Sequence, residues 1–500
     1  MAQLGDLPPE LILTIFSHLR LGLPMHDLFV WPGDIDEQGQ ITGVRWNDLL
    51  NFSLLNRHFR RIVSDKLYTQ IRIHGKLPIP RLVSLLRFVT AHPHAAADVR
   101  QVYINLDPWT TGSAFLQLAD VDFIQTAAAK VGITYPQEIF HCDDRLAGAS
   151  EEREIGLGIG GFLELEHLRL QVLVNISLAH LKGTQELALT CAYGIFRNFG
   201  LNDLAKLPGL IDVGEADDST STADKRPMVV SKPCLPQLFS LVTTRIIPNR
   251  LIGFDGDEIA NLLCIGPKIT RLCLAEAGLD FKIQKSENWT NNSHLTLTTQ
   301  HIGTVAVRSI ANHCSALSTF KYLPELGLYE PTASRPAQLR EVIGALRKHA
   351  NTLRTLCISS LAHLPSGSIT MPVYTLNGFV ALENLWIDRR TITGDSDVFP
   401  RMLDGIGMVD PREGFIRSLP RSMKRLHLQS ASHLSSAGLY WLAGNSKLFP
   451  DLIRVELDVW PKGDGDTPEE VVQKLFLQVG VDARTGRDMV RDARLWDRYF

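Results

Sequence analysis

The sequence has few cysteines, and their placement suits neither a disulfide framework nor a zinc site. The seven cysteines lie at positions 142, 191, 234, 264, 273, 314 and 357, an odd number that includes no C-x-x-C pair. Disulfide-stapled domains and structural zinc sites both need paired or clustered cysteines. We therefore expect no structural metal and a reducing compartment, cytoplasmic and/or nuclear.

Long apolar runs, an N-terminal signal and an excess of basic charge are missing as well. No stretch of 18 or more apolar residues occurs, and MAQLGDLPPE at the start carries no basic region before an apolar core. The net charge is −3, without a long basic run, so nothing favours a nucleic-acid partner. We expect no membrane or nucleic-acid partner. The 500 residues exceed one compact core, which predicts several domains or an extended solenoid.

Catalytic and cofactor-binding motifs are either missing or out of context. No G-x-S-x-G, H-E-x-x-H or Walker loop occurs. Residues 156–161 satisfy G-x-G-x-x-G, but a dinucleotide site needs a strand before the glycines and a helix after them. We expect a strand at 165–170 instead, and hence a flexible turn at the glycines. Residues 34–39 resemble the start of a calcium loop, but Arg45 stands where a bidentate glutamate belongs. These observations predict no cofactor, no metal and no enzymatic activity.

What is present from about residue 76 is a recurring L-x-x-L-x-L spacing, which predicts short strands. The expected strands are 99–104, 165–170, 269–274, 317–322, 353–358, 382–387, 423–428 and 452–457. Helical periodicity precedes several of them, at 81–91, 300–313, 337–349 and 434–443. One strand–helix unit cannot bury its apolar side alone, so stacked units should form a solenoid. The expected fold class is α/β, with irregular leucine-rich-repeat-like units over residues 76–460.

Two further segments interrupt or follow these repeats. Residues 212–232 are rich in Asp, Ser, Thr and Pro, which indicates a disordered loop. Residues 461–500 are expected to contain one more helix near 468–478, followed by a tail.

The first 75 residues follow a different, helical pattern. Pro8 and Pro9 suit the first turn of a helix, whose amides lack partners in any case. Apolar residues then fall on one helical face, and the pattern returns at 47–55 and 59–67. Glycines and prolines break it at 20–47, which we expect to be an inserted loop exposed to protease.

In this segment, residues 7–19 and 48–62 resemble the two halves of an F-box. The matching elements are Leu-Pro-x-Glu-Leu, Ile-Phe-Ser-x-Leu and Leu-x-Asn-Arg-x-Phe-Arg-Arg, in that order. Members of the F-box family bind the adaptor of SCF-type ubiquitin ligases through a small helical unit, and the adaptor binds a cullin scaffold. A second domain, often of leucine-rich repeats, captures the substrate. The family usually joins its halves by a few residues, whereas residues 20–47 intervene here, and it often has tryptophan where Phe59 stands.

The resemblance and the strand pattern together indicate two sets of contact residues. Carried over by position, the adaptor-binding residues would be Leu7, Pro8, Leu11, Ile15, Phe16, Leu19, Leu54 and Phe59. Side chains that alternate with the buried leucines should line the open strand face and contact a substrate. These are Arg169, Arg271, Lys321, Trp386, Arg425 and His427, of which Trp386 and Arg425 belong to the types most enriched in binding hot spots.

The sequence thus predicts a non-catalytic substrate receptor of an SCF-type ubiquitin ligase, with an unknown protein substrate. Two alternatives remain open. One is an adaptor-binding scaffold with no role in ubiquitination, and the other is an enzyme that uses the glycine run.

Overall fold

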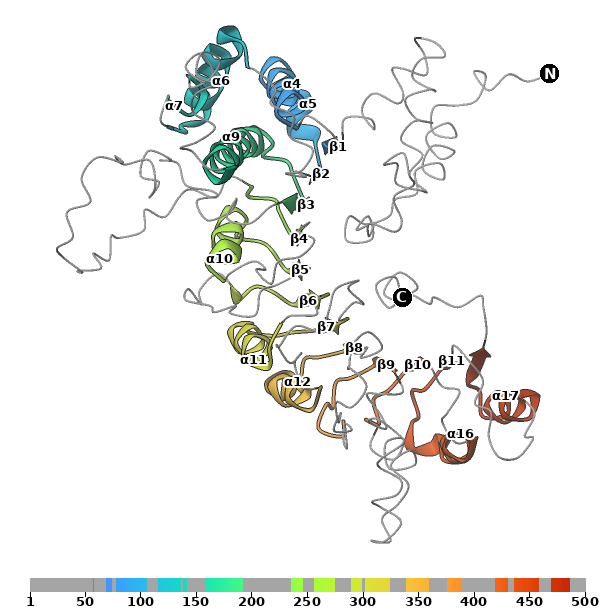
Figure 1. The fold of residues 1–500 in the computed structure, drawn as a ribbon. Helices are drawn as coiled ribbons and strands as arrows, with labels where there is room; N and C mark the ends of the chain where they lie inside the picture. Colours follow the sequence, from blue (N-terminus) through green and yellow to red (C-terminus); the bar gives the residue numbers. More distant parts are fainter. Residues whose placement is uncertain are drawn as a thin grey trace, which may run out of the picture. The chain divides into compact units, whose positions relative to one another are not determined.

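Parallel strands in chain order, joined by helices, make up most of what the computed structural model describes (Figure 1). The described residues are 57, 69–73, 78–105, 116–135, 138–141, 159–191, 235–245, 256–274, 289–298, 302–323, 339–358, 376–388, 419–429, 436–457 and 469–485. The chain divides into a first unit, residues 1–248 with 257–269, and a second unit, residues 249–256 with 270–500.

The described residues of the first unit form four parallel strands in chain order. They are β1 (Gln70–Ile73), β2 (Gln101–Asn105), β3 (Glu186–Cys191) and β4 (Ser240–Arg245). Parallel neighbours need long crossovers, which here contain helices. These are α4 (Pro78–Ala91), α5 (Pro93–Asp98), α6 (Leu118–Val131), α7 (Glu138–His141) and α9 (Ile159–His180), and α10 (Gly256–Ile265) follows β4.

Helix α9 is the core element of the first unit. All of its side chains from Arg169 to Ala179 are buried, and the helix contacts α4, α5, α6 and α7. A helix buried on every side loses the one-sided apolar stripe of a surface helix. Helices α6 and α7 lie on the side of α9 away from the strands (Figure 1), so they add an outer layer to this unit.

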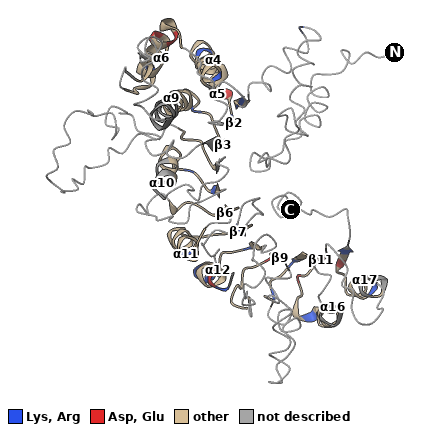
Figure 2. Ribbon diagram, viewed as in Figure 1, with Lys and Arg blue, Asp and Glu red and all other residues tan. Residues whose placement is uncertain are grey.

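Charge and aromatic contacts join α4 to this outer layer. The Arg87 guanidinium lies 2.6 Å from an Asp120 carboxylate oxygen and 5.2 Å from the centre of the Phe123 ring. Figure 2 shows basic residues on α4 and acidic residues on α6.

In the described part of the second unit there are eight parallel strands, again in chain order. They are β5 (Arg271–Leu274), β6 (His294–Leu297), β7 (Thr319–Tyr322), β8 (Thr355–Ile358), β9 (Asn384–Asp388), β10 (Arg425–Gln429), β11 (Arg454–Leu457) and β12 (Asp482–Thr485). Its helical elements are α11 (Thr304–His313), α12 (Leu339–Leu346), η6 (Arg347–His349), α16 (Ser436–Gly444), η8 (Ser446–Leu448) and α17 (Glu469–Gln478).

The L-x-x-L-x-L spacing places two apolar side chains of each strand on one face. In β9 these are Leu385 and Ile387, which pair in register with Leu426 and Leu428 of β10, and all four are at most 1 % exposed. Burying a leucine or isoleucine fully stabilises a fold by about 1.5–3 kcal/mol relative to exposure. Because equivalent residues repeat on successive strands, their contacts form one continuous apolar layer in the second unit.

A repeated backbone contact holds the strands in register. The carbonyl just before one strand accepts N–H bonds from two consecutive residues of the next repeat. The Arg354 carbonyl accepts from Glu383 and Asn384 at 2.9 Å each, and the Glu383 carbonyl accepts from Lys424 and Arg425 at 2.7 and 3.0 Å. The same arrangement occurs in the first unit. The stacking therefore stays regular although the connections differ in length.

The predicted α/β class is confirmed, and the stacked parallel strands are compatible with a solenoid-like arrangement. The strands expected at 99–104, 269–274, 317–322, 353–358, 382–387, 423–428 and 452–457 are present, as are the helices expected at 81–91, 300–313, 337–349, 434–443 and 468–478. The strand expected at 165–170 is wrong, because these residues lie inside α9. The turn expected at the glycine run is wrong in part, since Gly160 and Gly161 belong to the first turn of that helix.

The strand array also exceeds the expected limits of 76 and 460. Strand β1 starts at Gln70 and pairs with β2, and β12 pairs with β11. The described residues include none of 1–68 except Arg57, so the F-box-like segment and its insert at 20–47 lie outside them. The loop expected at 212–232 lies outside them too.

Candidate functional site

The strand face opposite the apolar layer carries two parallel rows of side chains in the second unit. Successive strand residues point to opposite faces, so residues two apart share one face. The middle row lies between the two apolar positions and consists of Cys273, Thr296, Lys321, Cys357, Trp386, His427, Glu456 and Arg484. The outer row precedes it by two residues and consists of Arg271, His294, Thr319, Thr355, Asn384, Arg425, Arg454 and Asp482.

The central feature of the middle row is a stacked pair of rings. The Trp386 indole and the His427 imidazole lie 3.6 Å apart between centroids and 11° from parallel. Both residues are at most 1 % exposed, and Trp386 clusters with Leu323 and Cys357. The indole N–H donates to Oε1 of Gln429 at 3.3 Å, which satisfies its polar atom. At these two residues the strand face is therefore packed and closed to solvent.

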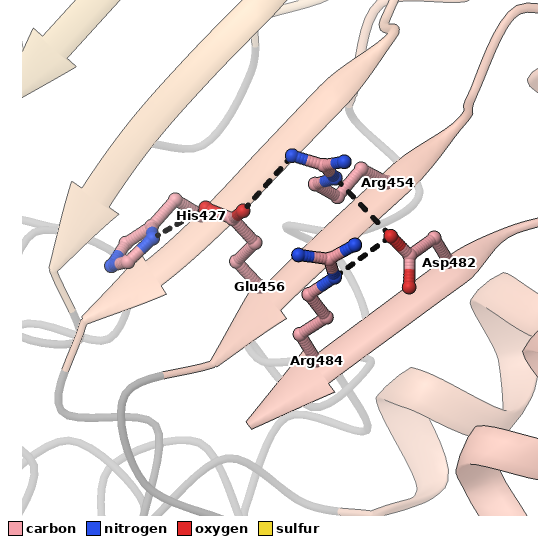
Figure 3. Close-up of polar contacts among 5 residues, drawn as sticks. All are labelled: His427, Arg454, Glu456, Asp482 and Arg484. Atoms are coloured by element: carbon pink, nitrogen blue, oxygen red, sulfur yellow. Dashed lines mark hydrogen bonds and ion pairs between the residues drawn. The ribbon is translucent and has the colours of Figure 1, made fainter. Parts of the chain in front are cut away.

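From His427 a network of hydrogen bonds and ion pairs runs across three strands to the outer row (Figure 3). His427 Nδ1 lies 3.2 Å from Glu456 Oε2, and Glu456 Oε1 lies 3.7 Å from Nη1 of Arg454. Asp482 Oδ2 accepts contacts from Nε of Arg454 at 3.4 Å and from Nε of Arg484 at 2.8 Å. The network passes from a buried imidazole to exposed arginine and aspartate side chains. These side-chain contacts connect β10, β11 and β12 on one face of the strands.

A second cation adjoins this network. Arg425 of β10 pairs in register with Arg454 of β11. Burial and the positive charge of Arg454 lower the pKa of Arg425, while the Glu456 carboxylate raises it. An arginine keeps its charge at any physiological pH. The outer row therefore presents two adjacent guanidinium groups on β10 and β11.

Five of the predicted substrate-binding residues lie on this strand face, but they are not equally accessible. Arg271 is exposed and Arg425 is half-buried. The expected exposure is wrong for Lys321, Trp386 and His427, because each is at most 3 % exposed. Trp386 and His427 are buried because their rings stack on each other, and Trp386 also packs against Cys357 of the neighbouring strand.

Arg169 does not belong to the strand face at all. It lies in α9 of the first unit, is 2 % exposed, and donates from Nε to the Ile139 carbonyl at 2.7 Å. The expectation that Arg169 lines an open strand is therefore wrong. The predicted adaptor-binding residues, from Leu7 to Phe59, lie outside the described residues.

The sequence reasoning missed Arg454, Glu456, Asp482 and Arg484. Arg454 and Glu456 alternate with Val455 and Leu457, so the rule used for the other strands could have found them. Asp482 and Arg484 lie in a strand without the leucine frame, and only their alternation gives a signal.

Within the described ranges, no group of three or more His, Cys, Asp or Glu side chains could hold a metal ion. In the same part of the chain, no helix has the length and apolarity needed to cross a bilayer. No protein-family model matches this chain, and no curated protein matches it either.

Proposed function

We propose that this chain is a non-catalytic substrate-recognition subunit of an SCF-type ubiquitin ligase. Residues 1–75 would bind the adaptor through their F-box-like halves, and the repeat region, an irregular leucine-rich-repeat-like solenoid, would bind a protein target. The observation that carries the proposal is the ordered pair of half-motifs at 7–19 and 48–62. Amphipathic helices that only bury an apolar face would not require these motifs in this order.

The geometry of the second unit supports the receptor half of the proposal. Its outer row and the neighbouring middle-row residue Arg484 present charged side chains from successive strands. Arg454 and Arg484 are 27 % and 56 % exposed in their side chains, and Asp482 is 43 % exposed. A hydrogen-bonded array of strands holds such groups in fixed positions, so a partner loses less free energy in ordering them. The chain would contribute proximity to a reaction catalysed by other subunits.

Co-precipitation from cells tests the adaptor contact. Tagged full-length wild type should recover the adaptor and, through it, the cullin, whereas Leu7→Ala/Pro8→Ala should recover much less of both. Leu118→Ala is a matched control, because Leu118 is an apolar residue that is 67 % exposed on α6, outside the F-box-like segment. A wild-type chain that recovers no adaptor would refute the proposal.

Target turnover separates the receptor from the alternative, an adaptor-binding scaffold with no role in ubiquitination. Proteins recovered with wild type in the presence of a proteasome inhibitor should have longer half-lives when Leu7→Ala/Pro8→Ala replaces wild type. If adaptor binding holds but no recovered protein changes its half-life, the scaffold alternative is correct.

A further inference from the structure

An open groove runs along the turns that lead into β7–β11 of the second unit. Its volume is about 660 Å³, which falls within the range of roughly 300–1,000 Å³ typical of binding pockets. The lining residues are Ala316, Ser318, Asn351, Thr352, Arg354, Val380, Ala381, Glu383, Ser422, Lys424 and Asp451. The groove is thus built from turn residues and is distinct from the two rows on the strand face.

The groove repeats one structural position on successive strands. Ser318, Arg354, Glu383 and Lys424 each directly precede a strand, and their carbonyls accept the paired backbone N–H bonds described above. The backbone at these four positions is fixed by this ladder. The Cα atoms that carry their side chains are therefore held at the spacing of neighbouring strands, about 4.8 Å.

Judged by the described residues, the groove carries one unpaired charge of each sign near its two ends. Between them, Lys424 Nζ lies 3.1 Å from Glu383 Oε2, so these two charges compensate each other. Arg354 and Asp451 are both exposed, and neither side chain has a hydrogen-bond or ion-pair partner among the residues described. Because the four charges sum to zero, a polyanion such as a nucleic acid would gain little electrostatic binding free energy in this groove.

The spacing of the two unpaired charges sets the length of a complementary ligand. Arg354 precedes β8 and Asp451 belongs to the turn before β11, three strand steps away. Three steps correspond to about 14 Å, which an extended peptide spans in about four residues.

Several lining residues of the groove suit an extended main chain. The hydroxyls of Ser318, Thr352 and Ser422 donate to backbone carbonyls at 3.1, 2.9 and 2.9 Å, so their oxygens keep lone pairs that can accept peptide N–H groups. Val380, which is 62 % exposed, offers an apolar contact on the wall.

We infer that this groove binds an extended segment of a partner protein that carries one acidic and one basic side chain about four residues apart. The acidic side chain contacts Arg354, the basic one contacts Asp451, and the segment crosses the turns of β8–β11. This inference deepens the proposed function by giving the chemistry of a protein target, and it rests on that function only in taking the partner to be a protein.

The direct test measures fluorescence polarisation of end-blocked peptides with full-length protein. The probes share one Gly/Ala/Val frame and carry Asp/Lys, Asp/Asp or Lys/Lys at positions four apart. Because an exposed ion pair contributes up to about 1 kcal/mol, wild type should bind the Asp/Lys peptide roughly fivefold more tightly than either like-charged peptide. The preference should shrink at high salt. A wild-type protein that does not discriminate among the three peptides would refute the inference.

Charge reversal provides the specific control. Arg354→Glu should shift the preference to the Lys/Lys peptide, and Asp451→Lys should shift it to the Asp/Asp peptide. Arg347→Glu and Asp98→Lys reverse exposed charges outside the groove and should keep the wild-type preference. Circular dichroism verifies that each variant is folded. Arg354→Gln removes the charge without reversing it and should reduce the preference for the Asp/Lys peptide. Reversal variants that stay folded and bind like wild type would overturn the assignment.

Adaptor co-precipitation separates this inference from the proposed function. Arg354→Glu should leave adaptor recovery unchanged, because the groove lies outside residues 1–75. Peptide discrimination without adaptor recovery would refute the ligase proposal alone. Adaptor recovery without peptide discrimination would refute the groove alone.

Discussion

The backbone N–H of Leu317 donates a hydrogen bond to Nδ1 of His349 over 3.3 Å. Since Nδ1 accepts, the imidazole is neutral and its proton is on Nε2, which donates to the Ala311 carbonyl at 2.8 Å. Next to it, Lys348 Nζ donates to the Asn312 carbonyl at 2.6 Å. Carbonyls at the end of a helix lack partners within the helix. The η6 segment therefore caps α11 and fixes the turn that leads into β7.

Acidification should destabilise the second unit through His349. Burial lowers its pKa, the hydrogen bond to Ala311 raises it, and Lys348 lowers it further, with a net shift below 6.5. A folded-state pKa below the unfolded value contributes stability that is fully present above 6.5 and is lost as pH falls through the folded value. The melting temperature should therefore fall between about pH 7 and pH 5. Thermal unfolding followed over this range measures the effect.

The control for this pH dependence is a side chain that keeps both bonds but cannot titrate. Glutamine can accept from Leu317 and donate to Ala311, so His349→Gln should show a smaller loss on acidification. His94→Gln, at an exposed position, should behave like wild type. His180 also has a pKa lowered by burial, so part of the wild-type response should persist in His349→Gln. Equal pH profiles for His349→Gln and wild type would exclude the assignment.

Trp386→Ala should destabilise the second unit rather than weaken a contact with a partner. The residue is fully buried and stacked on His427. Truncating a buried tryptophan costs about 3–5 kcal/mol. Chemical denaturation should report a loss of that size in the free energy of unfolding, while Trp386→Phe should lose less. If Trp386→Ala keeps its stability and loses only partner recovery, the side chain is a binding residue after all.

The exposed end of the ion-pair network should contribute little to stability. The Arg454 and Asp482 side chains are 27 % and 43 % exposed, and such pairs typically contribute about 0–1 kcal/mol. A double-mutant cycle with Arg454→Ala and Asp482→Ala should give a coupling free energy below about 1 kcal/mol that decreases at high salt. A coupling that is large and insensitive to salt would show that the pair is shielded from solvent.

Arg169→Met should destabilise the first unit. The buried guanidinium donates to the Ile139 carbonyl between α9 and α7, and a hydrogen bond to a charged group contributes about 1.5–3 kcal/mol. Arg308→Met, at an exposed position of α11, is the control and should change stability little. Denaturation curves of the two variants give the comparison, and equal stabilities would mean that the buried bond is dispensable.

The strands that the sequence failed to reveal explain the limits of the leucine pattern. In the turns before β3 and β6, Thr184 and Asn292 stand at the first position of the L-x-x-L-x-L spacing, and their side chains donate to the carbonyls of Leu181 at 2.8 Å and Trp289 at 3.1 Å. A polar residue can replace the leucine there because its side-chain donor bonds a carbonyl of the same turn, although Oδ1 of Asn292 has no hydrogen-bond partner among the described residues. The spacing rule cannot anticipate this exchange.

The opposite error arose where the pattern occurs in another element. Leu165, Leu168 and Leu170 satisfy the strand spacing but belong to α9, whose following turns are buried on all sides. Full burial removes the helical period from the sequence, and a short apolar run is then ambiguous between helix and strand. For the site, alternation predicted which strand face carries Trp386 and His427. It could not predict their burial, which depends on stacking between neighbouring strands.

Cys314 should resist alkylation in the folded chain at mildly alkaline pH. The thiol is fully buried at the end of α11, and burial raises its pKa to about 12, although the positive charge of Lys348 lowers it somewhat. Alkylating reagents attack the thiolate, which at this pKa is scarce, and the sulfur is also inaccessible. Half-buried Cys264 and Cys273 should therefore be modified by iodoacetamide before Cys314. Peptide mass spectrometry over a time course measures the order in which the cysteines are alkylated. In denaturant this difference between the cysteines should disappear. Modification of Cys314 first in the native protein would mean that the α11 end opens on the time scale of labelling.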